Sequence, residues 1–147
     1  YSQQFTFLPG ALKGLAASFN YTWIDTHGLY TGNRYLTRSE VAGFIPRTGN
    51  VIVSWRHRRL SARVRVNYTG DYVTTYSAAS AARSLYVRSR TMVNASLGFE
   101  LWPNLSLTCD VANLTNAHQV QYRGIPDQIQ LHSLHGTTVS VGLNGRF

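Results

Sequence analysis

Residues 136–147 alternate between polar and apolar side chains along almost their whole length. Because an extended strand points successive residues to opposite faces, this segment is predicted to have one apolar and one polar face. The apolar face carries Val139, Val141, Leu143 and Phe147. The polar face carries Thr138, Ser140, Asn144 and Arg146. The apolar face of such a strand contacts either the second sheet of a soluble sandwich or the lipid around a membrane barrel.

The composition favours alternating strands over membrane helices. Only 14% of the 147 residues are charged and 12% are aromatic, a low charge content for a soluble domain. No run of residues approaches the roughly 20 apolar positions that a spanning helix requires. We therefore expect residues 1–147 to form one structured all-β unit.

The basic charge of the chain raises the question of a nucleic-acid partner. The net charge of +8 comes from 14 basic residues, nearly all arginine, against six acidic ones. The densest basic group is 56–59, and neither an aromatic cluster nor a nucleic-acid-binding motif accompanies it. We expect no nucleic-acid partner. The single Cys109 lies on the apolar side of its segment and is expected to be a spectator.

Period-two alternation predicts seven strands joined by connections of alternating length. The predicted strands are about 2–8, 15–26, 47–56, 60–72, 93–101, 105–122 and the segment after 128. Short connections are expected at 9–14, 57–59 and 102–104, long ones at 27–46 and 73–88, and an intermediate one at 123–128. Tight turns on one side and long loops on the other are typical of a transmembrane β-barrel.

Strand length and aromatic placement point the same way. Tilted strands that span a membrane need about 9–11 residues, whereas soluble strands average about five or six. Several predicted strands reach the longer class. Aromatic residues, which favour the lipid–water interface, gather at the strand ends. They are Tyr21, Trp23, Tyr68, Tyr72, Phe99, Trp102 and Phe147.

Several segments, in this order, resemble the TonB-dependent outer-membrane receptors. They are 7–15 (FLPGALKGL), 20–22 (NYT), 45–50 (IPRTGN), 61–68 (SARVRVNY), 110–116 (DVANLTN) and 136–147 (GTTVSVGLNGRF). The resemblance implies an antiparallel barrel of 22 strands, filled by an N-terminal plug. It implies that residues 1–147 are the C-terminal part of that barrel domain and supply its last seven strands, without the plug and earlier strands.

The same resemblance implies a location and partners. The location is the outer membrane of a Gram-negative bacterium. The partners are outer-membrane lipid and lipopolysaccharide, the protein's own plug domain and missing strands, a TonB-type coupling protein reached through the missing N-terminal part, and the barrel-assembly machinery. Seven strands are too few to close a barrel, so the chain is expected to be a piece of a longer protein.

No arrangement of residues predicts catalysis, a metal site or a cofactor. No Ser-His-Asp order or nucleophile elbow is present, so we do not expect an enzyme. His132 and His135 are three residues apart, which places them on opposite faces of a strand and argues against a shared metal.

Three groups of residues are candidates for other roles. Polar side chains expected to face a lumen are Arg63, Arg65, Glu100 and Asp110. The two arginines either bind an anionic solute or plug acids, or simply pair with Glu100 and Asp110. Ligand-contact candidates in the long loops are Tyr30, Arg34, Tyr35, Arg38, Tyr76, Arg83 and Tyr86. These loop residues suit a ligand or the sugar-lipid of the outer leaflet. The resemblance implies that Phe147 is the barrel-assembly signal.

The expected function is therefore part of an active-transport receptor that imports a scarce nutrient, such as a siderophore or an oligosaccharide, with energy from the TonB system. Two alternatives remain open from the residues. One is another outer-membrane barrel, a porin or secretion pore. The other is a soluble basic β-sandwich that binds a surface or nucleic acid.

Overall fold

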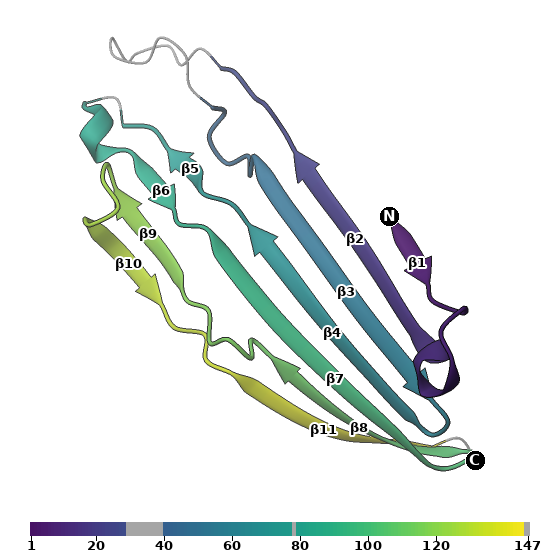
Figure 1. The fold of residues 1–147 in the computed structure, drawn as a ribbon. Helices are drawn as coiled ribbons and strands as arrows, with labels where there is room; N and C mark the ends of the chain where they lie inside the picture. The colour runs from purple at the N-terminus through teal and green to yellow at the C-terminus, as the bar shows by residue number, and fades with distance from the viewer. Residues whose placement is uncertain (29–39, 78, 146–147) are drawn as a thin grey trace.

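The computed structural model describes residues 1–28, 40–77 and 79–145 and shows an all-β chain built from antiparallel sheets (Figure 1). The first half contains β1 (Ser2–Gln4), the 3-10 helix η1 (Gly10–Gly14), β2 (Leu15–Trp23), β3 (Arg47–His57), β4 (Leu60–Thr69) and β5 (Tyr72–Thr75). The second half contains η2 (Ala81–Arg83), β6 (Leu85–Val87), β7 (Arg90–Trp102), β8 (Leu105–Ala112), β9 (Gln119–Arg123), β10 (Ile129–Ser133) and β11 (Thr138–Gly145).

The main sheet has seven strands in the order β1-β2-β3-β4-β7-β8-β11. Each strand pairs antiparallel with its neighbours, which confirms the predicted antiparallel arrangement. The tight connections 58–59 and 103–104 lie at the same end of the sheet as η1, and the described residues 24–28 and 40–46 lie at the other end (Figure 1).

A smaller four-stranded sheet, β10-β9-β6-β5, extends four of these strands beyond the main sheet. Its strands follow the same order as their continuations β11, β8, β7 and β4, and in Figure 1 they prolong the sheet at the end opposite the tight turns. We name this smaller sheet the extension.

The extension corrects several predicted boundaries. The fourth predicted strand breaks at Gly70 and Asp71, just after the Gly70 amide makes the last bond to β3 by donating to the Arg47 carbonyl. The predicted loop 73–88 contains most of β5 and all of β6. The sixth predicted strand is interrupted between β8 and β9, and the seventh between β10 and β11. The first and second predicted strands are too long, since β1 ends at Gln4 and β2 at Trp23.

The strand register places apolar side chains in rows on one face of the main sheet. One row runs through Ala17, Val53, Val64, Ala95, Val111 and Val139. The next row runs through Leu15, Trp55, Ala62, Leu97, Cys109 and Val141. Cys109 thus lies on the apolar face, as the alternation predicts.

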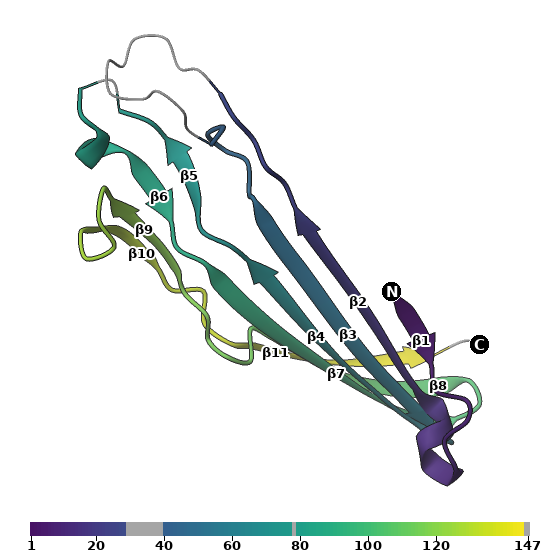
Figure 2. The same cartoon turned by 45° about the horizontal axis from the view of Figure 1, so that its top comes forward.

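The main sheet is a single curved layer with no described element stacked on either face (Figure 2). Among the described residues the buried hydrophobic side chains are Val73 in β5 and Val87 in β6, both in the extension. The apolar rows are open: Leu97 is 60% exposed and Val141 70%. Within the described ranges, no helix is long and apolar enough to cross a membrane. The large apolar face is therefore left without a covering layer.

The connection between β1 and β2 packs tightly against β3. A Cβ on Gly14 would lie 1.6 Å from the Arg56 carbonyl oxygen, so no larger residue fits there without moving the backbone. The Trp55 indole Nε1–H donates to the Ala11 carbonyl oxygen at 2.9 Å. Together these contacts hold η1 on the end of the sheet.

Asn113 links the main sheet to the extension. It is 5% exposed and has a φ of 55°, a left-handed conformation that asparagine tolerates better than most residues. Its side-chain Nδ2 donates to the Gly136 and Ala117 carbonyls at 2.9 and 3.3 Å, and its Oδ1 accepts from the Ala117 amide at 2.7 Å. Its backbone amide donates to Asn94 Oδ1 at 2.9 Å. One residue thereby joins β7, the β8–β9 bend and the segment before β11.

We predict that Asn113→Ala destabilises the protein by about 3 kcal/mol, because it removes three side-chain hydrogen bonds and puts alanine in the left-handed region. Urea unfolding of the protein, followed by tryptophan fluorescence, measures this change. Asn144→Ala, at an exposed position in β11, is the matched control and is expected to change stability by less than about 0.5 kcal/mol. Equal effects of the two substitutions would contradict the role of Asn113.

Candidate functional site

The face opposite the apolar rows carries the polar side chains of the main sheet. One polar row runs through Ser54, Arg63, Ser96, Asp110 and Ser140 on five adjacent strands. Arg65 lies opposite Asn94, and Glu100 lies opposite Ser106. The four residues predicted to share a polar face, Arg63, Arg65, Glu100 and Asp110, therefore do share one.

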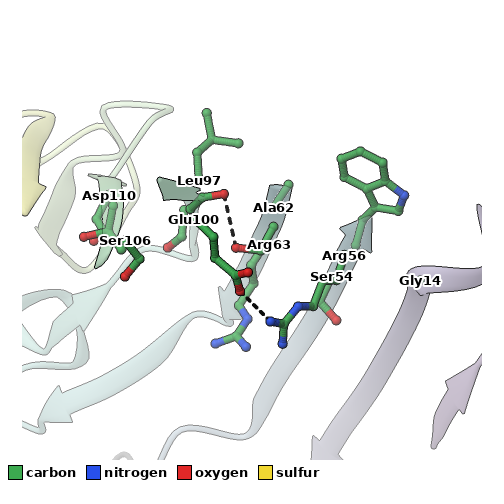
Figure 3. Close-up of a pocket in the computed structure, with 14 residues that line it drawn as sticks. Gly14, Ser54, Arg56, Ala62, Arg63, Leu97, Glu100, Ser106 and Asp110 are labelled. Carbon is green, nitrogen blue, oxygen red and sulfur yellow. Dashed lines mark hydrogen bonds and ion pairs between the residues drawn. The ribbon is translucent and has the colours of Figure 1, made fainter. Parts of the chain in front are cut away.

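This polar face is hollowed near the tight-turn end (Figure 3). The hollow has a volume of about 460 Å³ and is lined by side chains of β3, β4, β7 and β8, including Arg56, Arg63, Glu100 and Asp110. Glycine and serine residues form part of its wall. A Cβ on Gly98 would lie 2.5 Å from Ser61 Oγ, so the glycine leaves room for the neighbouring strand's side chain.

An ion pair crosses the hollow. Arg56 Nη2 donates to Glu100 Oε1 at 2.6 Å, and both side chains are exposed, at 71% and 46%. The prediction that Arg63 and Arg65 pair with Glu100 and Asp110 is wrong for Glu100, whose partner is Arg56. The sequence-based prediction did not include Arg56 among the site residues. Its position in the alternation, on the face opposite Val53 and Trp55, already places it on the polar face.

The chemistry that this hollow supports is electrostatic. Its charged side chains are solvent-exposed, and Arg56 and Glu100 are paired across strands, so it can contact a polar or charged surface. The part of the chain that the structure describes contains no cluster of three or more side chains able to hold a metal.

A second hollow of about 300 Å³ lies where the main sheet meets the extension. Its lining includes Tyr68, Tyr72, Tyr86, Tyr122, Asp71, Arg47 and Glu40. The Tyr86 and Tyr122 rings, which face each other across β6 and β9, stack with centroids 5.4 Å apart. Partial burial, with the nearby Asp71 charge adding to it, raises the pKa of the Tyr122 hydroxyl. The phenol is therefore neutral at pH 7 and able to donate a hydrogen bond.

The predicted loop residues fall in different places. Tyr86 is not in a loop, because it belongs to β6 and pairs with β9. Tyr76 follows β5, and its hydroxyl donates to the Glu40 carbonyl at 2.7 Å. Arg83 ends η2. The remaining candidates, Tyr30, Arg34, Tyr35, Arg38 and Phe147, lie outside the described residues.

Two groups near the extension were missed by sequence reasoning. Tyr122 was predicted only as the end of the strand 105–122, since its stacking partner Tyr86 is distant in sequence. His118 and His132 meet at 3.0 Å between ring nitrogens, although they are 14 residues apart. Only the pairing of β9 with β10 brings these two rings together.

Comparison with known proteins gives no match to a protein-family model, to a curated protein or to a solved structure.

We predict that Arg56 and Glu100 are coupled by about 0.5 kcal/mol, as expected for an exposed ion pair. The experiment is a double-mutant cycle with Arg56→Gln and Glu100→Gln, measured by urea unfolding of the protein. A cycle with Arg63→Gln in place of Arg56→Gln is the control and is expected to be additive. Since salt screens exposed charges, 1 M salt should weaken the Arg56 coupling. A larger coupling for Arg63 would contradict this pairing.

Proposed function

We propose that this chain forms part of the barrel wall of an outer-membrane active-transport receptor of the TonB-dependent kind. In this proposal the apolar face of the main sheet contacts lipid and the polar face lines the lumen. The single observation that carries it is a long, single-layer antiparallel sheet whose apolar face has no described partner.

The exposed apolar rows support lipid as the covering phase. Monomeric soluble proteins rarely expose contiguous apolar patches beyond a few hundred Å². Here the rows cross six strands, and Val139, Val141 and Leu143 on β11 are 62%, 70% and 61% exposed. A sandwich would need a second sheet over these rows, and the described residues supply none.

Strand length supports a spanning sheet. β2, β3, β4 and β7 contain 9, 11, 10 and 13 residues. A tilted strand needs about 9–11 residues to cross the hydrocarbon core. The short strands of the extension then stand beyond the membrane on the side of the long connections, as outside loops of such barrels do.

Exposed aromatic residues mark both ends of these strands. Tyr21 and Trp23, at the end of β2 away from the tight turns, are 51% and 72% exposed. Phe99 and Trp102, at the tight-turn end of β7, are 40% and 65% exposed. Aromatic girdles at the two lipid–water interfaces have this arrangement.

The free edges of the sheet support a wall segment rather than a complete barrel. β1 and β11 are the outer strands, and among the described residues neither has a partner on its outer side. In hydrocarbon each unpaired backbone group costs several kcal/mol, so further strands must complete the ring. These strands belong to the rest of the barrel.

The receptor assignment within the barrel class rests on the resemblance and on the polar face. A charged wall with Arg56, Arg63, Glu100 and Asp110 suits contact with a plug domain inside the lumen. The nutrient, a siderophore or an oligosaccharide, would meet the loop side of the barrel, where the tyrosine-lined hollow at the sheet junction lies.

We predict that Leu97→Arg destabilises the folded protein by about 2–4 kcal/mol or blocks its assembly, because it places a charge on the lipid-facing side of β7. Ser96→Arg, one residue earlier on the polar face, is the matched control and should be tolerated. The measurements are the amount of intact protein in the outer-membrane fraction and its urea unfolding in lipid vesicles.

Leu97 is 60% exposed, so the effect of arginine at this position depends on whether lipid or water covers this face of the sheet. On a water-facing surface, arginine at such an open position would change stability by less than about 0.5 kcal/mol. Equal tolerance of Leu97→Arg and Ser96→Arg would overturn the lipid-facing assignment.

A second experiment separates a receptor from a porin. The intact protein, purified and inserted in a planar lipid bilayer, is expected to show no open conductance, because a plug fills a receptor barrel whereas porins keep an aqueous channel. The reading frame upstream of Tyr1 is expected to encode a plug of domain size and a short segment that binds the TonB-type coupling protein. A stable open channel without an upstream plug would favour the porin.

A further inference from the structure

Two histidines from neighbouring strands of the extension are in direct contact. His118 Nδ1 lies 3.0 Å from His132 Nε2, and the ring centroids are 4.9 Å apart with the planes tilted by 58°. His118 immediately precedes β9, and His132 in β10 pairs with Val120, two residues further along. This is a diagonal cross-strand relation on one face of the sheet, which brings long side chains into contact.

The pair is accessible from solvent. His132 is exposed and His118 is half-buried. In the neutral state one ring donates its N–H and the other accepts with its lone pair. Both contacting nitrogens are therefore also potential metal ligands, because a neutral imidazole nitrogen without its proton coordinates a metal.

We propose that His118 and His132 form a two-histidine binding site for a divalent transition metal, with Cu²⁺ the preferred ion. Bonds of about 2.1 Å to two imidazole nitrogens, set at a right angle, separate those nitrogens by about 3 Å. The observed separation of 3.0 Å already matches that spacing. Each ring needs only a rotation that points the lone pair of its contacting nitrogen at a shared metal ion.

The choice of Cu²⁺ follows from the ligands. Imidazole suits copper, nickel and zinc, and among these divalent ions the affinity of a given site is highest for Cu²⁺. A closed tetrahedral zinc site needs four ligands, and the described residues bring no third ligating side chain to this pair. Tetragonal Cu²⁺ accepts two cis nitrogens, and water fills its remaining positions.

Metal binding dictates the tautomers of both rings. The ring that donates the hydrogen bond gives up that proton to water and takes one up on its other nitrogen, so that His118 carries its proton on Nε2 and His132 on Nδ1, with no net release of protons from the neutral pair. The two strands are then joined by the metal in place of one hydrogen bond. The site adds a side-chain link between β9 and β10 to their backbone pairing and to the turn around Gly124.

The test is a Cu²⁺ titration of the intact encoded protein, purified in detergent without a histidine tag and followed by electron paramagnetic resonance. We expect one tightly held Cu²⁺ per chain, with hyperfine splitting from two nitrogens. His118→Gln and His132→Gln are each expected to abolish this signal. His135→Gln, which changes an exposed histidine just beyond β10, is the matched control and should leave it unchanged.

The wild-type spectrum tests the proposal even if a variant folds poorly. A spectrum showing one nitrogen ligand or none, or no stoichiometric binding, would overturn the site. So would an unchanged signal in a His132→Gln protein whose far-ultraviolet circular dichroism matches that of the wild type. Because His132 is exposed, that variant is expected to fold.

Discussion

The hydrogen-bonded ladder between neighbouring strands is the interaction on which this structure depends. Six strand pairs hold the main sheet together, and no second layer of described residues covers it. A soluble domain of this size normally buries a hydrophobic core, yet Val73 and Val87 are the buried hydrophobic side chains among the described residues. The ladder supplies hydrogen-bond partners for the backbone. Each face of the sheet must then contact a medium that suits its side chains. In the proposed function, lipid on one side and water on the other meet this requirement.

The junction between the main sheet and the extension is where the structure is packed most closely. Val73, Val87, Ser84 and Asn113, the buried residues of this chain's described part apart from glycines, all lie there or in the extension. Strands β4, β7, β8 and β11 all break at this level, so backbone groups released from the ladder need new partners. Asn113 supplies several of them, and Asp71 Oδ1 accepts from the Ser89 amide at 2.6 Å. Side-chain hydrogen bonds thus replace the ladder where it is interrupted.

The alternation of the sequence predicted the faces well because register and period are local properties. Cys109 and Val141 were assigned to the apolar face from their own segments, and the register places them in one row. The interruptions of the strands between the main sheet and the extension could not be predicted in the same way. Residues 73–88 contain Ser, Ala and Arg in a pattern typical of a loop, and β5 and β6 form by pairing with each other and, for β6, with β9. Similarly, no pattern in residues 113–118 predicts that the Asn113 side chain donates a hydrogen bond to the Gly136 carbonyl.

Side-chain reach explains why Arg56, rather than Arg63, finds Glu100. Arg56 lies opposite Ser61, which in turn lies opposite Gly98. Glu100 is two residues beyond that glycine on β7. Partners on second-neighbour strands are about 10 Å apart, since each interstrand spacing is about 4.8 Å. The pair must also reach along the strands by two residues, which the long arginine and glutamate side chains can do, and the small Ser61 on the strand between them leaves the path open. Arg63 lies opposite Ser96, four residues from Glu100 on β7, so the rise along the strand alone separates these positions by about 13 Å. The position of each arginine along its strand therefore decides which of them pairs with Glu100.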